Sequence, residues 1–391
     1  AIAAGQYGLA SSLCDLALEW LDRQPTTAVT IRGRVAREWV QWRRGRGSAR
    51  VAEGFRTLID DAARLAPETV AATALAGADA ALVRAAWPEA MSLARRAADA
   101  AEGRDAMLAA AALRHGEAEY AERPGAGLTR LRDAVAKGER AGDTGLRALG
   151  ALTLGTALSR DAVSAEADAL LTRALELARD AHDTALTAAI SQSLGILRGR
   201  QGAALESRQW LGDAERLFTT LEDEPGRVVT VLQGARLLRD QGAREEAHRQ
   251  FAAAARRAKE IDLAWVEMAA LAGSALSNGG AASEEGQERW QRTSALIADA
   301  RPDWWFPGRE LVDAFAVQVA LAGGQSGAAF DLFLRARRRA EELDPWGAAW
   351  LVAECAPALE TAGIRSLAST RREAADQVKR RGFAALAGAL N

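Results

Sequence analysis

The residue types that most often catalyse reactions or bind metals are few in this chain and lie far apart. Its histidines are His115, His182 and His248, and its cysteines are Cys14 and Cys355. None of them has the spacing of a zinc site, a CxxC pair or a nucleophile beside its base. The GxxxxGK[ST], HExxH and GxSxG motifs are also absent. We therefore expect no metal site, no cofactor and no catalytic residue, and we predict that the chain is not an enzyme.

The basic side chains are mostly arginines, and acidic side chains balance them. The 391 residues carry 50 basic and 52 acidic side chains, with a formal net charge of −2, and lysine occurs only at Lys137, Lys259 and Lys379. A near-neutral balance argues against a nucleic-acid or anionic-membrane partner. No uncharged apolar run is long enough to span a bilayer, and no secretory signal is visible. Since two isolated cysteines are typical of reduced thiols, we expect a cytoplasmic protein.

Small residues recur every forty residues and indicate how the remaining side chains are positioned. The first set is Ala94, Ala134, Ala174, Ala214 and Ala254, followed by Ser294 and Ala336. Large apolar residues usually stand three positions earlier, and small ones four positions before those. These spacings place all three on one face of a helix.

A second set with the same period lies upstream of the first and comprises Gly155, Gly195, Ala235 and Ala275. Short breaks at 199–202, 241–243 and 278–286 separate the two sets, and alternating β-branched runs are absent. Each unit is therefore predicted to be helix A, turn, helix B, turn. Aspartates in the turns, at Asp143, Asp183 and Asp262, are predicted to cap the next helix. Because no such unit buries its apolar face alone, the sequence predicts an all-α superhelical solenoid of antiparallel helix pairs.

Two stretches resemble the tetratricopeptide repeat. One is "SQSLGILRGRQG" followed by Ser207, Leu211 and Ala214, and the other is "EEAHRQFAAAARRAKEID". The units have forty residues rather than the usual thirty-four. Repeats of this length are similar to those in the sensor regions of bacterial signal-transduction ATPases and LuxR-type activators.

The resemblance covers most of the chain and divides it into three parts. Residues 51–361 are expected to form the repeat array. Residues 1–50 and 362–391 are expected to be N-terminal and C-terminal capping helices, because terminal units usually differ from internal ones.

In arrays of this family the A helices line a concave groove, and the resemblance therefore implies a binding face. The positions that it places there as candidate partner-binding residues are Thr156, Gln192, Arg236 and Arg239, with Arg160 and Arg200 nearby. A groove of arginine and leucine suits a protein segment with acidic and apolar residues. The alternative is that these arginines are solvated. The asparagine and lysine clamp of some family members is not evident.

Two further stretches are candidate contact surfaces. Trp304, Trp305 and Phe306 interrupt the array and could anchor a partner, since aromatic side chains are enriched at interfaces. Alternatively they fill a gap between two poorly matched repeats. The basic run Trp42–Arg50 is the other candidate, for an acidic ligand.

Two functions fit these patterns. The first is a non-enzymatic scaffold that binds a protein or peptide segment in the concave groove. The second is a ligand-sensing or autoinhibitory module of a larger bacterial signalling protein, such as an ATPase, a protease or a transcription regulator. The chain begins at Ala1 rather than at a methionine. The sequence therefore leaves open the alternative that the partner is another domain of the same polypeptide.

Overall fold

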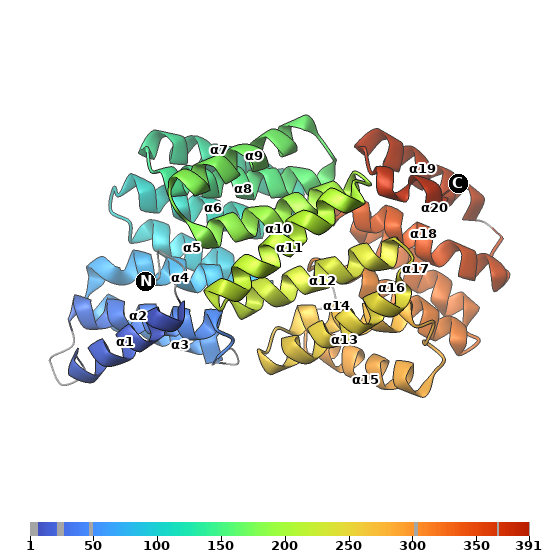
Figure 1. Cartoon of the computed structure of the whole chain (residues 1–391), viewed down its shortest axis with the longest axis horizontal. Coiled ribbons are helices and arrows are strands. Elements are labelled where there is room, and N and C mark those ends of the chain that lie inside the picture. Colours follow the sequence, from blue (N-terminus) through green and yellow to red (C-terminus); the bar gives the residue numbers. More distant parts are fainter. Residues whose placement is uncertain (1–6, 22–26, 47–49, 301–303, 366, 391) are drawn as a thin grey trace.

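A computed structural model describes residues 7–21, 27–46, 50–300, 304–365 and 367–390 of the chain. These residues form helices and turns and contain no strand. Figure 1 shows the helices stacked in antiparallel pairs from the N-terminal end, through α10–α13 in the middle, to the C-terminal end. The prediction of an all-α solenoid is confirmed.

The first helices are α1 (Tyr7–Leu21), α2 (Ala28–Arg43), α3 (Val51–Leu65), α4 (Val70–Val83), α5 (Trp87–Asp99), α6 (Asp105–Glu122), α7 (Pro124–Ala141), α8 (Thr144–Asp161), α9 (Ala165–Asp180) and α10 (Thr184–Arg200). They are followed by α11 (Ala204–Leu221), α12 (Glu224–Asp240), α13 (Arg244–Glu260), α14 (Ala264–Ser277), α15 (Glu284–Ala298), α16 (Arg309–Ala322), α17 (Ser326–Leu343), α18 (Pro345–Thr361), α19 (Leu367–Arg381) and α20 (Ala387–Leu390). Two 3₁₀ turns, η2 (Pro67–Thr69) and η3 (Ala384–Leu386), join this series.

The forty-residue period corresponds to one helix pair. The first set of small residues falls on the B helices α5, α7, α9, α11, α13, α15 and α17, and the second set on the A helices α8, α10, α12 and α14. Each A helix packs against its own B helix, and successive A helices from α4 to α14 also contact one another. The A helices therefore form the inner layer of the superhelix, and the B helices form the outer layer.

Aspartate caps mark the start of three A helices. The carboxylates of Asp143, Asp183 and Asp223 accept hydrogen bonds from backbone amides three residues on, at 2.7, 2.9 and 3.0 Å. The predicted cap at Asp262 is wrong. Asp262 has φ of 53°, and Leu263 occupies the cap position without a side-chain hydrogen bond. The forty-residue register passes from Asp223 to Leu263, so the aspartate lies one position too early.

The small residues of the A helices allow each helix pair to pack closely. A Cβ on Gly195 would lie 2.8 Å from Cγ of Leu211, and one on Gly155 would lie 3.0 Å from Cγ of Leu171. Both leucines belong to the B helix of the same unit and are buried. The period thus repeats one contact, in which a small residue on helix A meets a large one on helix B.

Contacts between distant helices close the superhelix on itself. The indole Nε1 of Trp265 on α14 donates to the carbonyl of Val83 at 2.7 Å, and Nε1 of Trp304 donates to that of Ala85 at 2.8 Å. In return, Nε1 of Trp87 donates to the carbonyl of Trp305 at 2.7 Å. The turn between α4 and α5 therefore lies against residues about 180 to 220 positions later in the chain.

The two ends of the chain are held in the same way. Arg43 at the end of α2 forms an ion pair with the buried Asp223 between α11 and α12. The backbone amide of Val163 donates to the carbonyl of Arg381 at 2.8 Å, and the Arg381 guanidinium pairs with Asp161. Helices α1–α2 and α19 thus cover the middle of the array. The boundaries of the capping segments at 50 and 362 remain predictions.

The small-to-large contact leads to a test of the repeat register. We expect Gly195→Leu to destabilise the fold by about 1–3 kcal/mol, because the new side chain would overlap Leu211. Gly212 lies on the next helix, and a Cβ there meets nothing within 4 Å. Gly212→Leu is therefore the matched control, and we expect it to leave stability unchanged or slightly raised. Urea unfolding that shows equal stability for both variants would contradict the register.

Candidate binding face

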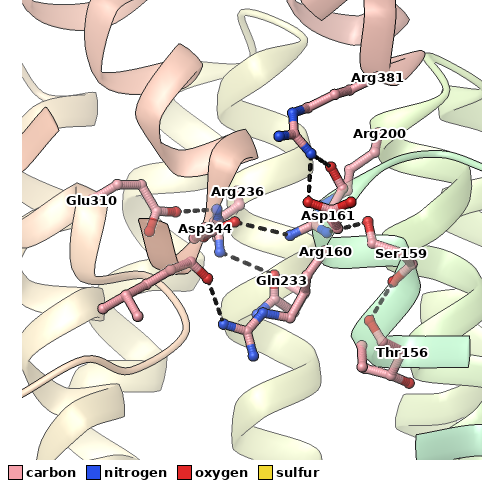
Figure 2. A network of polar contacts seen from close by, with 12 residues as sticks. Thr156, Ser159, Arg160, Asp161, Arg200, Gln233, Arg236, Glu310, Asp344 and Arg381 are labelled. Atoms are coloured by element: carbon pink, nitrogen blue, oxygen red, sulfur yellow. Dashed lines mark hydrogen bonds and ion pairs between the residues drawn. The ribbon is translucent and has the colours of Figure 1, made fainter. Parts of the chain in front are cut away.

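The six candidate groove residues lie on three consecutive A helices. Thr156 and Arg160 belong to α8, Gln192 and Arg200 to α10, and Arg236 and Arg239 to α12. We call this side of α8, α10 and α12 the inner face. Figure 2 shows that Arg236 and Arg200 point toward Glu310 and Asp344, which belong to the C-terminal third of the chain.

Arg160 lies between aromatic rings. Its guanidinium carbon is 3.8 Å from the ring centroid of Trp305 and 4.8 Å from that of Tyr120. Its Nη2 donates to the carbonyl of Leu343, the last residue of α17, at 3.0 Å. A guanidinium stacked on aromatic faces in this way gains cation–π energy that is greatest when water is excluded.

Arg200 makes a similar set of contacts one repeat later. Its Nη1 donates to the carbonyl of Ser159 at 2.7 Å, and its Nη2 lies 3.9 Å from Oδ1 of Asp344. Its guanidinium carbon also lies 5.6 Å from the ring centroid of Trp346. Arg200 thus joins α8 to the start of α18 (Figure 2).

The two arginines of α12 pair with carboxylates. Arg236 forms a close ion pair with Glu310 on α16. Nη2 of Arg239 lies 2.6 Å from Oε1 of Glu354 on α18, and its guanidinium carbon is 5.0 Å from the ring of Trp350. Arg239 on α12 therefore contacts both a carboxylate and an aromatic ring of α18.

The charged groups of these inner-face pairs are largely buried, so each one is stabilised by the opposite charge of its partner. The side chain of Arg239 is 7% exposed and that of Glu310 is 3% exposed. Burial raises the pKa of Glu310, and the guanidinium of Arg236 opposes that rise. Burial lowers the pKa of Arg200, and the carboxylate of Asp344 opposes that fall. The alternative of solvated arginines is therefore wrong for Arg239 and Arg200, which are held by partners within the chain.

Thr156 and Gln192 link neighbouring A helices. The hydroxyl of Thr156 donates to that of Ser193 at 3.1 Å, and Nε2 of Gln192 donates to the hydroxyl of Thr230 at 2.7 Å. Both side chains are partly exposed. They form a polar row across α8, α10 and α12 beside the arginines.

The aromatic run is mostly buried. Trp305 is 5% exposed and Phe306 is fully buried, while Trp304 is partly exposed. These side chains are packed within the chain, but they fill the space between the distant α4–α5 turn and α14 and not a gap between two neighbouring repeats. In this conformation only Trp304 has an accessible surface for a partner.

The other predicted candidates are dispersed. Arg43 and Arg44 of the basic run pair with Asp223 and Glu222, and Gly47–Ala49 lies outside the described residues. The three histidines lie on α6, before α10 and on α13. In the described part of the chain, no three His, Cys, Asp or Glu side chains gather as metal ligands, and no helix is long and apolar enough to cross a membrane.

The sequence reasoning missed the residues that cover the inner face. These are Glu310, Asp344, Trp346, Trp350 and Glu354. Trp346, Trp350 and Glu354 are spaced four apart and so share one face of α18. That spacing was an available signal, but it does not by itself indicate which helix the face meets.

The comparisons with known proteins concern the fold. No protein-family model and no curated protein sequence matches the chain. A search of solved structures finds the crystal structure of a Rap protein complexed with competence and sporulation factor, with a TM-score of 0.57 and 14% identity. The match covers 96% of this chain and 95% of that one. The likeness is one of fold. It spans nearly the whole chain and supports the assignment of the helical-repeat fold.

The pair Arg239–Glu354 provides a test of the inner-face contacts. We expect Arg239→Met or Glu354→Met alone to cost about 3 kcal/mol, because each leaves a largely buried charge without its partner. The double variant should cost much less than the sum of the two. The exposed pair Arg216–Asp213 is the control, for which we expect less than about 1 kcal/mol. Additive losses in urea unfolding at Arg239 and Glu354 would contradict the pairing.

Proposed function

We propose that this chain is a non-enzymatic scaffold that binds a protein segment on its inner face. The observation that carries the proposal is that α8, α10 and α12 present arginines in successive repeats, each in contact with an acidic, aromatic or carbonyl group of another part of the chain. A face with this chemistry suits a helical or extended segment that carries carboxylates next to aromatic side chains.

Incomplete hydrogen bonding within the inner face supports the proposal. Nε of Arg160, Nε of Arg239 and Oδ1 of Asp344 are buried without a hydrogen-bond partner among the described residues. Each unpaired buried polar group costs free energy. Because the chain's own segment satisfies the face only in part, a foreign segment with better placed groups can compete for it. The Rap protein of the structural match is itself in complex with a factor, which agrees with a binding role for this fold.

The same contacts favour a second candidate function, an autoinhibitory or ligand-sensing module of a larger signalling protein. In this conformation α16–α18 occupy the inner face, so a partner binds only if they move or rearrange. A ligand that binds the opened state more tightly shifts the population toward that state. The size of the shift is set by the difference between the ligand's affinities for the two states. The resemblance to long regulatory repeats agrees with such a switch.

A displayed library of random peptides tests both candidates. We expect peptides that combine acidic and aromatic residues to be enriched on the wild-type chain. We expect their binding to be lost in Arg236→Gln/Arg239→Gln and kept in the surface control Arg216→Gln/Arg249→Gln. Hydrogen exchange with the best peptide bound should show added protection in α10 and α12. Circular dichroism should show that both variants stay folded.

Three other outcomes have defined meanings. Enrichment that appears only after Glu354→Gln loosens α18 would favour the autoinhibitory module over the open scaffold. Protection confined to other helices would overturn the inner face as the site. Failure to enrich any sequence on either chain would overturn peptide binding altogether.

A further inference from the structure

A groove on the outside of the solenoid lies apart from the inner face. It runs between the B helices α5 and α7, with the A helix α6 as its floor, and has a volume of about 750 Å³. This volume lies within the range of about 300–1,000 Å³ that is typical of pockets for small molecules. None of the inner-face residues lines this groove.

The walls of the groove are strongly basic. Its lining contains five basic side chains and two carboxylates, an excess of three positive charges in a chain whose net charge is −2. The basic residues are Arg95, Arg123, Arg130, Lys137 and Arg140. Such a local excess of one sign in a concave site concentrates anions.

Only part of this charge is neutralised within the chain. Glu119 accepts from Nη2 of Arg123 at 2.6 Å and from Nε of Arg130 at 2.5 Å. Arg95, Lys137 and Arg140 are exposed and have no ion-pair partner in the part of the chain that the structure describes. Arg95 belongs to the α5 wall, and Lys137 and Arg140 belong to the α7 wall, so the unpaired cations stand on both sides of the groove.

His115 adds a polar group at the floor of the groove. Its Nδ1 is buried without a hydrogen-bond partner and lies 3.9 Å from Oε2 of Glu119. Burial lowers the pKa of His115, and the positive charges of Arg130, Arg95 and Arg123 lower it further. The carboxylate of Glu119 opposes this fall, but the net shift is downward and favours the neutral imidazole, in which one ring nitrogen donates and the other accepts.

The remaining floor is small and apolar. Leu108, Ala111 and Ala112 of α6 form it, and Met91, Ala94 and Ala98 of α5 border it. Short alanine side chains leave room for a flat or apolar group. From Arg130 to Arg140 the basic side of α7 extends about 15 Å, at a rise of 1.5 Å per residue. The groove thus combines an apolar floor with a line of cations about as long as one small organic molecule.

We propose that this outer groove binds a phosphorylated small molecule of nucleotide size. Its phosphate groups would meet Arg95, Lys137 and Arg140, and its less polar body would lie on the alanine floor. Arginine favours phosphate through paired hydrogen bonds, and three unpaired cations match the charge of a polyphosphate better than that of a single carboxylate. The limited volume of the groove favours a compact ligand over a long acidic peptide.

Isothermal titration calorimetry with ATP as the probe tests the proposal on the full chain. We expect Lys137→Glu/Arg140→Glu to weaken ATP binding by at least tenfold. Arg256→Glu/Lys259→Glu is the matched control, because these exposed cations on α13 have the same spacing and give the same change of charge. It should bind ATP as the wild type does. Thermal melting of all three proteins establishes that each is folded.

Three probes separate the possible contributions to binding. Inorganic triphosphate should bind more weakly than ATP, and adenosine should bind weakly or not at all. Equal affinity for triphosphate and ATP would overturn the role of the floor. Equal weakening by the two charge variants, or no ATP binding by the wild type, would overturn the site. Tighter binding of hexaglutamate than of ATP would overturn the ligand class in favour of an acidic protein segment.

Discussion

The contact between the arginines of the inner face and the C-terminal third of the chain is the interaction on which the rest of the structure depends. A guanidinium loses its hydration when it is buried, and it is tolerated only when carboxylates, carbonyls or aromatic faces replace the water. Arg160, Arg200, Arg236 and Arg239 find such groups on α16–α18 and on the loop that precedes α16. Removing one side of these contacts would leave several buried charges unpaired at once.

Closure of the superhelix follows from the same requirement. The tryptophan hydrogen bonds at the α4–α5 turn place Trp305 where it stacks on Arg160. The ion pair of Arg381 with Asp161 holds α19 beside α8. Regions far apart in sequence thus meet around the arginines of the inner face. The solenoid is therefore closed on itself rather than an open spiral.

The sequence predicts the local structure well, because each repeat relies on short-range patterns. The forty-residue period places the helix pairs, and the contact of Gly195 with Leu211 follows from its small and large positions. The partners of the inner face are not predictable in the same way. Glu310 and Glu354 look like ordinary surface acids in the sequence. What buries them is the curvature summed over many repeats, and no single repeat encodes that curvature.

The outer groove is also not predictable from the sequence alone, because it depends on the packing of three helices. Arg95 and Arg140 lie 45 positions apart and become opposite walls only because α5 and α7 flank α6. Two faces with different chemistry result: an inner face that is occupied by other parts of the chain, and an outer groove in which Arg95, Lys137 and Arg140 have no ion-pair partner among the described residues. We propose that a protein segment binds on the first of these faces and a small anion in the second.

The occupied inner face is the central claim, and double electron–electron resonance tests it most directly. Spin labels at Gln241→Cys and Ala362→Cys, both exposed, report the distance between the end of α12 and the end of α18 in a background with Cys14→Ser and Cys355→Ala. If α18 stays on the inner face, we expect one narrow distance distribution for the unliganded chain. A broad or two-peaked distribution with Arg239 and Glu354 intact would show that α18 does not stay on the inner face, and would contradict this claim.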